Sequence, residues 1–214
     1  MTATLYSYWR SSAAYRVRIA LNLKGLDYET VPVSLVDGRH RSDEFRARNP
    51  QGFVPYYDDG NVATGQSLAI MEYLEEAHPV PPLLPPDPAD RAFVRAFANL
   101  VCCDIHPLNN LRVLRYLEAE FGAGDDAKHA WYRHWIEEGF AAAETLAVRH
   151  ANRGVYTQGD LPTIADACLV PQVYNARRFD LDMARWPRLA AIDAACRELE
   201  AFRRAAPEAQ PDAP

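Results

Sequence analysis

The stretch WRSSAAYRVRIAL, residues 9–21, decides how the first part of this chain folds. It follows ATLYSY, residues 3–8, whose composition favours a strand, and it changes at once to apolar residues at helical spacing. We therefore predict a strand over 3–8 and a helix over 12–23 that stops at Gly25. Such a junction brings serine hydroxyls and unpaired backbone N–H groups together at a helix start, where an anion can bind.

The segments that follow extend this junction to a β-α-β-α-β-β-α module. DYETVPVSL (27–35) alternates as a second strand does, and SDEFRARNP (42–50) contains a short helical turn. VPYYDDGNVAT (54–64) predicts two strands joined at Asp59-Gly60, which is a strong hairpin signal. QSLAIMEYLEEAH (66–78) has the apolar spacing of a helix.

A run of prolines separates this module from the rest of the chain. Between His78 and Asp90 the sequence PVPPLLPPDP holds six prolines and predicts a stiff connector. Beyond it, helical periodicity covers 89–120, 127–150, 163–178 and 187–204, with no convincing strand pattern. We therefore expect a first α/β domain over 1–78, a linker over 79–88 and an all-α domain over 89–214.

Two local patterns in the second part are interpreted as structural. Thr163 to Asp166 has the Thr-x-x-acid form of a helix-capping box, and Pro162 before it fits a helix start. The tail AAPEAQPDAP, residues 205–214, is rich in proline and alanine, so we expect it to fray.

Composition limits the classes of function. The chain has 214 residues, of which 49% are hydrophobic and 24% charged, and its net charge of −6 gives no reason to expect nucleic acid or an anionic membrane as a partner. No apolar run approaches the roughly 20 residues of a membrane span, and no signal-peptide pattern is present. We expect reduced thiols, no metal site and a cytoplasmic location from the cysteines Cys102, Cys103, Cys168 and Cys196.

Taken together, the α/β module, the proline-bearing connector and the helical second part resemble a cytosolic glutathione transferase, whose first domain is thioredoxin-like. YSYWRSSAAYRVRIALNLKGLDYE (6–29) resembles the opening of the zeta class, which has Ser-Ser-Cys, an aromatic residue and Arg-Val-Arg-Ile-Ala-Leu. Further resemblance lies in FVPYYDDGNVATGQSLAIMEYLEE (53–76), CDIHPLNNLRVLRYL (103–117) and PTIADACLVPQVYNARRFDLD (162–182). The class includes glutathione-dependent maleylacetoacetate and maleylpyruvate isomerases, so the resemblance implies such an activity and a homodimer.

One residue departs from the class pattern. The cysteine that follows the serine pair is Ala13 here, so no protein thiol at this position can be the nucleophile. The isomerisation remains possible because glutathione can supply the sulfur: its thiolate adds to the double bond, the bond rotates, and the thiolate leaves.

The resemblance assigns the glutathione site residue by residue. A free thiol has a pKa of about 8.5, so the site must favour the thiolate, and we assign that role to Ser11, ahead of Ser12, at the helix start. Val54, before a Pro55 that the class has in cis, is expected to pair with the cysteinyl part of glutathione. Gln66 and Ser67 are expected to hold its γ-glutamyl carboxylate.

The second substrate carries two carboxylates, so a cationic pocket is expected. Arg10, beside the serines, is the first candidate, followed by Arg112 and Arg178, because guanidinium groups bind planar carboxylates bidentately. His106 and Asn110 complete the polar set that the bacterial enzymes imply around glutathione. Their spacing of four puts them on one face of a regular helix, unless Pro107 bends or restarts it.

Structural interpretations of several of these residues stay open. His106 precedes a proline and can be structural, and Arg178 can simply complement a helix dipole, as can Arg177. Arg16 and Arg18 are interpreted as structural ion-pair or surface residues.

Three functions compete. The preferred one is a glutathione-dependent maleyl isomerase, with maleylpyruvate slightly favoured over maleylacetoacetate by the missing cysteine and the IHPLNN stretch (105–110). A general glutathione transferase would need a more apolar second pocket. A non-catalytic binding module would have no need of a complete glutathione site, although Ala13 leans toward it.

Overall fold

The computed structural model of the protein describes residues 2–150 and 154–214. They divide into two compact units: Met1–Leu83 with Arg197–Pro214, and Leu84–Cys196. The first unit thus takes in the end of the chain, which the sequence placed with the helical part. The boundaries at 78 and 88 stay a prediction.

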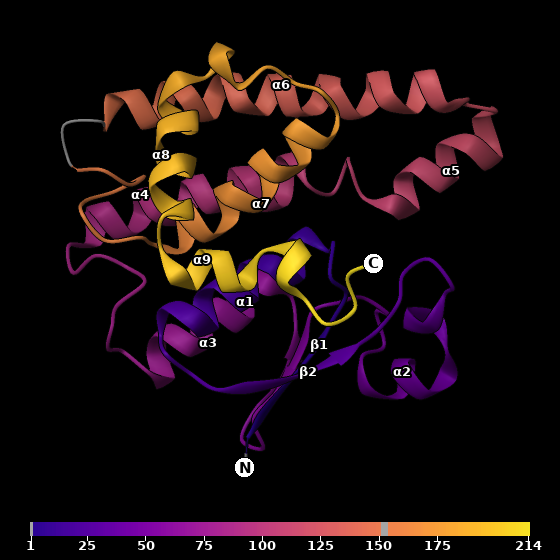
Figure 1. Cartoon of the computed structure of the whole chain (residues 1–214), viewed down its shortest axis with the longest axis horizontal. Helices are drawn as coiled ribbons and strands as arrows, with labels where there is room; N and C mark the ends of the chain where they lie inside the picture. The colour runs from indigo at the N-terminus through magenta and orange to yellow at the C-terminus, as the bar shows by residue number, and fades with distance from the viewer. Residues whose placement is uncertain (1, 151–153) are drawn as a thin grey trace. The chain divides into compact units, whose positions relative to one another are not determined.

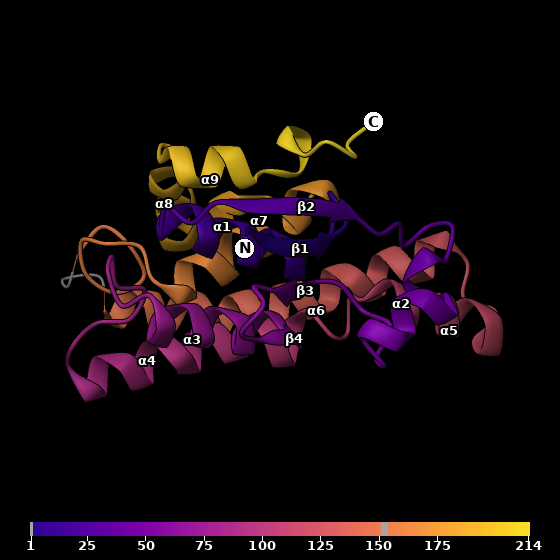
Figure 2. The same ribbon diagram turned by 90° about the horizontal axis from the view of Figure 1, so that it is seen from below.

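The first unit is built on one sheet. Among its described residues, four strands lie in the order β2-β1-β3-β4 (Figure 2). β1 pairs in parallel with β2 and antiparallel with β3, and β3 forms a hairpin with β4. Asp59 closes that hairpin because its Oδ1 accepts hydrogen bonds from the amides of Asn61 and Val62. The strands are β1 (Ala3–Ser7), β2 (Tyr28–Pro32), β3 (Tyr56–Asp58) and β4 (Ala63–Gly65).

Helix α1 is central to the first unit and has the bounds that the sequence predicts. It contacts both α3 and α9, which bring together segments far apart in the chain (Figure 1). Gly25, at a φ of +64°, ends α1, and the amide of Leu26 donates to the carbonyl of Leu21 at 3.0 Å. The helices of this unit are α1 (Ser12–Leu23), 3₁₀-helix η1 (Arg39–Arg41), α2 (Asp43–Arg48), α3 (Ser67–Ala77), α9 (Glu200–Ala205) and 3₁₀-helix η5 (Pro207–Ala209).

The last residues of the chain are ordered, so the expectation that residues 205–214 fray is wrong. Gln210 is buried, and its side-chain amide donates to the carbonyls of Arg204 and Ala206. Asp212 accepts a hydrogen bond from the backbone amide of Trp9. Specific polar contacts with Trp9, with Arg18 of α1 and with the end of α9 hold this segment, and its composition does not reveal them.

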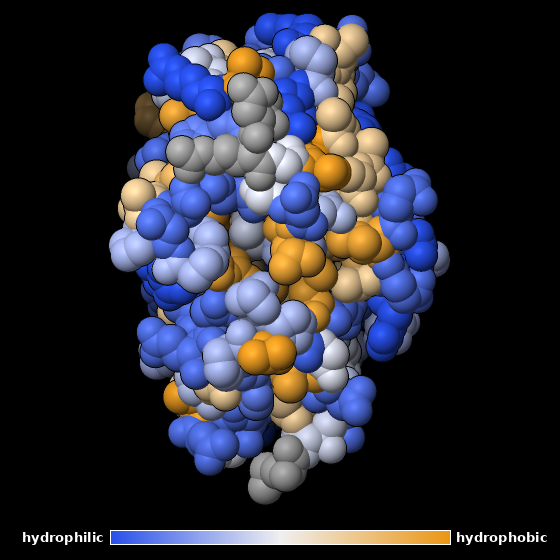
Figure 3. Space-filling model, turned by 90° about the vertical axis from the view of Figure 1, so that its left-hand side faces the viewer, coloured by the Kyte–Doolittle hydropathy of each residue, from blue (hydrophilic) through white to orange (hydrophobic). Residues whose placement is uncertain are grey.

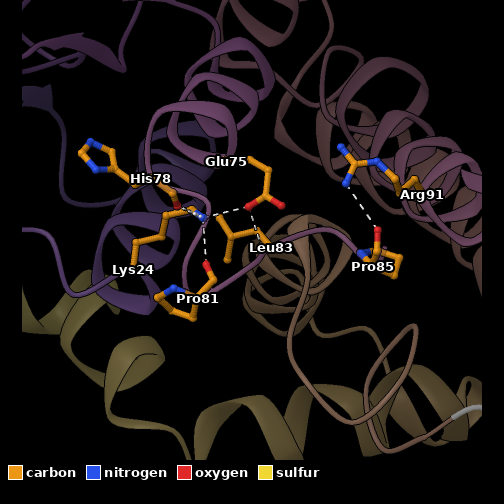
Figure 4. Close-up of polar contacts among 7 residues, drawn as sticks. All are labelled: Lys24, Glu75, His78, Pro81, Leu83, Pro85 and Arg91. Carbon is orange, nitrogen blue, oxygen red and sulfur yellow. Dashed lines mark hydrogen bonds and ion pairs between the residues drawn. The ribbon is translucent and has the colours of Figure 1, made fainter. Parts of the chain in front are cut away.

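A buried ion pair fastens the start of the proline-rich connector to α1 and α3. Lys24 Nζ lies 2.8 Å from Glu75 Oε2, and Lys24 also donates to the carbonyls of His78 and Pro81 (Figure 4). The same carboxylate oxygen accepts from the amide of Leu83 at 2.8 Å. The Lys24 side chain is fully buried, so these oxygen atoms take the place of water around its ammonium group.

We predict that Lys24→Met lowers the free energy of unfolding by about 3–5 kcal/mol, because it leaves the Glu75 carboxylate buried without its cation. Chemical denaturation of Lys24→Met, Glu75→Gln and the double variant measures this. The double variant should be more stable than Lys24→Met alone, since a neutral amide replaces the uncompensated charge. A double variant that is less stable than Lys24→Met contradicts the argument.

The second unit is helical, as the sequence predicts, with no strand among its described residues, 84–150 and 154–196. The predicted helix over 89–120 is nevertheless three elements, and the predicted helix over 187–204 is divided between α8 and α9. The elements are α4 (Pro88–Asn99), the π-helix η2 (Leu100–Ile105), α5 (Leu111–Phe121), α6 (Asp125–Arg149), α7 (Ile164–Arg178), 3₁₀-helix η4 (Met183–Arg185) and α8 (Pro187–Arg197).

Two packing features order this unit. Gly139 of α6 lies against η2 so closely that a Cβ there would come within 2.3 Å of the Ile105 side chain. The predicted capping box at the start of α7 is confirmed, with Asp166 accepting hydrogen bonds from Thr163 and Thr157. Burial raises the pKa of Asp166 in spite of these bonds.

The surface carries isolated apolar side chains. Large exposed apolar residues of the described chain include Val80, Val155 and Leu161. On the face drawn in Figure 3, hydrophobic groups, some of them adjoining, lie among hydrophilic ones. Single exposed apolar residues are normal for folded proteins. Among the described residues, none of the helices has the length and apolar character needed to cross a membrane.

Candidate functional site

The register of the sheet brings the predicted residues of the first unit to one edge. Tyr6 of β1 lies opposite Tyr56 of β3, and Tyr56 lies opposite Gly65 of β4. Because β1 and β3 are antiparallel, as are β3 and β4, the end of β1, the start of β3 and the end of β4 meet there. The predicted residues next to these three ends are Arg10, Ser11, Ser12, Val54, Pro55, Gln66 and Ser67.

Ser11 is the N-cap of α1. Its Oγ accepts a hydrogen bond from the amide of Ala14 at 3.2 Å, and its own amide donates to the carbonyl of Tyr8 at 2.9 Å. Since the cap uses a lone pair of the hydroxyl oxygen, the hydroxyl proton can still be donated to an anion. Ser12, the first residue of α1, is buried.

The helix starts at this edge keep their positive ends uncompensated. The first turns of α1 and α3 contain no acidic residue, which is also true of α5 and α8 but not of α2, α4, α6 and α7. An acidic side chain in the first turn stabilises a helix but competes with an external anion for the same N–H groups. The starts of α1 and α3 therefore suit an anionic ligand.

The residues beside β3 and β4 adopt unusual backbone geometry. The Val54–Pro55 bond is cis, as the resemblance implied, and Val54 is buried against Val33 and Phe45. Gln66, the N-cap of α3, has a φ of +67°, which is strained for a residue with a side chain. Its side-chain amide donates to Gln51 Oε1 at 2.8 Å.

Ser67 is joined to a buried cation that the sequence did not point to. Arg16 Nη1 donates to Ser67 Oγ at 3.3 Å, and Arg16 is only 2% exposed. Its Nε and Nη2 atoms are buried without a hydrogen-bond partner among the described residues. The buried guanidinium of Arg16, on α1, therefore lies next to Ser67 at the start of α3.

Arg10 has a different environment from these buried groups. It is exposed, and its guanidinium lies 5.1 Å from the centre of the Trp9 ring. The ring limits the positions that the side chain can take while leaving its N–H groups available for a carboxylate.

The remaining predicted residues lie in the second unit. Asn110 is the N-cap of α5, where its Oδ1 accepts from the amide of Arg112 at 3.1 Å, and Arg112 itself is exposed. Arg178, the last residue of α7, donates to Asn175 Oδ1 and lies 5.6 Å from the Phe179 ring. His106 follows the π-helix η2, and its amide donates to the carbonyl of Val101.

For His106 and Asn110 the structure shows the alternative that the sequence allowed, a helix that restarts after Pro107. The two residues do not share the face of a regular helix, because η2 ends at Ile105 and α5 begins only at Leu111. Pro107 cannot donate a backbone hydrogen bond, and Asn110 starts the next helix as its cap.

Arg16 and Arg18 are structural residues, as the sequence suggested, but not surface or ion-pair residues. Both are buried in α1, and neither forms a salt bridge within the described part of the chain. Because both residues are charged, the sequence did not indicate that they are buried. They nevertheless belong to a run of residues, 14–21, that is buried throughout.

The comparisons with known proteins agree with this geometry. Residues 5–82 match the family model of the glutathione S-transferase N-terminal domain. A solved holo structure of maleylpyruvate isomerase, described as a bacterial glutathione S-transferase of the zeta class, matches with a TM-score of 0.97 and 53% identity, over 99% of this chain and 100% of that one.

The chain belongs to the zeta class of glutathione transferases. This zeta-class chain is 53% identical over 208 residues to a maleylpyruvate isomerase of Ralstonia sp., covering 97% of this chain and 98% of that protein. It is 52% identical over 215 residues to a probable maleylacetoacetate isomerase of Vibrio cholerae, covering 100% and 99%.

A further comparison concerns a ligand. The maleylacetoacetate isomerase of Anaeromyxobacter dehalogenans was solved with dicarboxyethyl glutathione and citrate in its active site. That structure is 46% identical to this chain, with a TM-score of 0.89, over 100% of this chain and 98% of that one.

The strained backbone of Gln66 leads to a stability prediction. We expect Gln66→Gly to be more stable than Gln66→Ala by about 1 kcal/mol, because both lose the contact with Gln51 but only glycine tolerates a φ of +67°. Urea denaturation measures the difference. Ala69→Gly, in the exposed interior of α3, should destabilise the protein, and a Gln66→Gly variant less stable than Gln66→Ala contradicts the assignment of strain.

Proposed function

We propose that this zeta-class protein is a glutathione-dependent cis–trans isomerase that converts maleylpyruvate or maleylacetoacetate to the fumaryl isomer. The observation that carries the proposal is full-length identity of 53% and 52% to proteins named for these two activities. The serine cap, the cis Val54–Pro55 bond and the start of α3, all at one edge of the sheet, support it.

In the proposed mechanism, the sulfur of glutathione is the nucleophile. No cysteine occurs in residues 1–83 or 197–214, so the unit that carries Ser11 offers no protein thiol for this role. The Ser11 hydroxyl donates to the sulfur, and the positive end of α1 favours its charge, so the thiolate is present at neutral pH. The thiolate adds to the double bond, the resulting single bond rotates, and loss of the thiolate gives the trans product.

The remainder of glutathione is assigned to the other two strand ends. The backbone of Val54 is proposed to pair with the cysteinyl part, and Gln66 and Ser67 to hold the γ-glutamyl carboxylate. Arg16 supports this assignment because its buried charge, hydrogen-bonded to Ser67 Oγ, attracts a carboxylate at that place.

The dicarboxylate substrate is assigned to Arg10, Arg112 and Arg178, whereas His106 and Asn110 are assigned to glutathione as further polar groups. Each of these three arginines is exposed, and a guanidinium group suits a planar carboxylate because it can donate two parallel hydrogen bonds. The ligand of the Anaeromyxobacter enzyme supports the chemistry, because in dicarboxyethyl glutathione the sulfur is bonded to a chain that carries two carboxylates. The proposed adduct has the same connection.

The remaining proposals concern the setting of the enzyme. The four cysteines, all within the described residues, carry thiols rather than disulfides, which supports a cytoplasmic location. We expect a homodimer, as is usual for this family. Neither relative's identity separates the two substrates, and the absence of the class cysteine at Ala13 favours maleylpyruvate.

A spectrophotometric assay of maleylpyruvate and maleylacetoacetate, with and without glutathione, tests the proposed function. We expect isomerisation of one or both substrates, strictly dependent on glutathione and with no net consumption of it. Accumulation of a stable glutathione conjugate, with no fumaryl product, would instead identify a general transferase.

Removing the Ser11 hydroxyl should change the pH profile. In Ser11→Ala the thiolate of bound glutathione loses a donor, so the pKa of the bound thiol rises and the acid limb of kcat/KM moves up by about one pH unit. Ser42→Ala is the matched control, because Ser42 caps α2 through the amide of Phe45 in the same way. If both variants lose stability but keep the original pH profile, the donor is Ser12 or a backbone amide.

Removing the Arg10 guanidinium should affect the dicarboxylate more than glutathione. Arg10→Ala is expected to lower kcat/KM for the maleyl substrate about 10- to 100-fold while changing the Kd of glutathione less than threefold. Steady-state kinetics and calorimetry measure the two effects, with the exposed Arg197→Ala as a charge-matched control. An equal loss in both would assign Arg10 to the glutathione site.

A further inference from the structure

Both backbone polar groups of Trp9 are held by side chains from elsewhere in the first unit. The amide of Trp9 donates to Asp212 Oδ2 at 2.9 Å, although the two residues are 203 positions apart in the chain. The carbonyl of Trp9 accepts from Arg18 Nη2, also at 2.9 Å. Trp9 stands directly before Arg10 and Ser11, so this double contact fixes the turn that presents them.

Arg18 connects that turn to the end of the chain. Its Nη1 donates to Ser7 Oγ at 3.0 Å and to the carbonyl of Tyr8 at 3.5 Å, while its Nε donates to the carbonyl of Ala205 at 2.9 Å. Arg18 is fully buried, and burial lowers its pKa to about 10, so the guanidinium is still charged at neutral pH.

Hydrogen bonds also fix the path of the C-terminal segment, from α9 to Asp212. α9 packs on α1, where Asn22 donates to the carbonyl of Ala201 at 2.9 Å. Gln210 then binds the carbonyls of Arg204 and Ala206 at the end of that helix. These contacts turn the chain back, and Asp212, two residues later, reaches Trp9.

We propose that Asp212 is a positioning residue of the thiolate site, which it serves by holding the Trp9 backbone together with Arg18. The proposal rests on the proposed glutathione-dependent function. The Tyr8 carbonyl provides the link to the site, because it accepts from both Ser11 and Arg18. A displacement at Trp9 therefore shifts the Ser11 cap and the Arg10 side chain that stacks on the Trp9 ring.

The electrostatic surroundings favour a carboxylate at position 212. Arg18 on α1 interacts electrostatically with Tyr28 and Tyr15 and, more weakly, with Asp212, and Arg204 of α9 also acts on Tyr28. Asp212 is the carboxylate among the groups that act on Arg18, so it offsets the buried charge while its Oδ2 accepts from Trp9. A neutral side chain in its place retains at most the hydrogen bond.

The test compares Asp212→Ala with Asp212→Asn. Asp212→Ala should lower kcat/KM for the maleyl substrate about 10- to 100-fold and move the acid limb of its pH profile to higher pH by about half to one unit. Asp212→Asn, which can still accept from the Trp9 amide but carries no charge, should recover part of the loss. The Kd of glutathione should change less than threefold, since its carboxylate is assigned to the start of α3.

Two further variants and one measurement separate positioning from stability. Glu208→Gln removes the same charge from an exposed residue of the same segment and should retain full activity. Gln210→Ala, which has no contact with Trp9, should reproduce the Asp212→Ala pattern because it releases the turn that delivers Asp212. Hydrogen exchange of the Trp9 amide, followed by NMR, should be at least tenfold faster in both Asp212→Ala and Gln210→Ala.

The outcomes are distinct. Faster Trp9 exchange together with a shifted pH profile supports the proposal. An unchanged pH profile and an unchanged kcat/KM in Asp212→Ala overturn it, even where the melting temperature falls, because a purely structural contact would act only on stability. Absence of glutathione-dependent isomerisation in the unaltered protein overturns the proposed function and this inference with it.

Discussion

The burial of two guanidinium groups in α1 is the constraint on which the rest of the first unit depends. Arg16 and Arg18 lie two positions apart, so on a helix they point about 200° from one another. Arg16 reaches the start of α3, and Arg18 reaches the turn before α1 and the end of α9. Buried charges are destabilising unless polar groups compensate them, so the neighbouring segments must keep the Ser67 hydroxyl and the carbonyls around Arg18 in place.

The consequence for the site is a division of tasks within one helix. The first turn of α1 supplies the Ser11 hydroxyl and an uncompensated positive end, while its interior supplies two cations behind the site. The thiolate assigned to the start of α1 is thus stabilised by a hydroxyl, by the helix N-terminus and by buried cations, without a basic side chain in contact with it. The exposed Arg10 is the exception, and it is assigned to the second substrate.

Much of this arrangement could be predicted from the sequence because its signals are local. The strand–serine–helix junction, the Asp59-Gly60 hairpin and the cis bond before β3 are encoded in short stretches that the structure reproduces. The contacts of Arg16 and Arg18 could not be predicted, since their partners Ser67 and Ala205 lie 51 and 187 residues away. Composition was misleading for the tail, where two polar side chains among prolines and alanines outweigh a tendency to fray.

In the helical unit, periodicity indicated helices correctly but not where they break. Pro107 and Asn110 indicate that a new helix begins after them, which the apolar spacing alone does not show. The π-helix that ends just before His106 has no recognisable sequence signal. The break between α8 and α9 falls at Glu198 and Leu199, where neither glycine nor proline marks it.

The composition of the first unit from both ends of the chain has a consequence for how the protein is made. Synthesis on the ribosome delivers the sheet, α1 and α3 first, but α9 and Asp212 emerge only after the whole of Leu84–Cys196 has been translated. Until then, Arg18 has neither the Ala205 carbonyl nor the Asp212 carboxylate beside it. The helical unit can therefore mature during translation, while the unit that begins the chain must wait for its last residues.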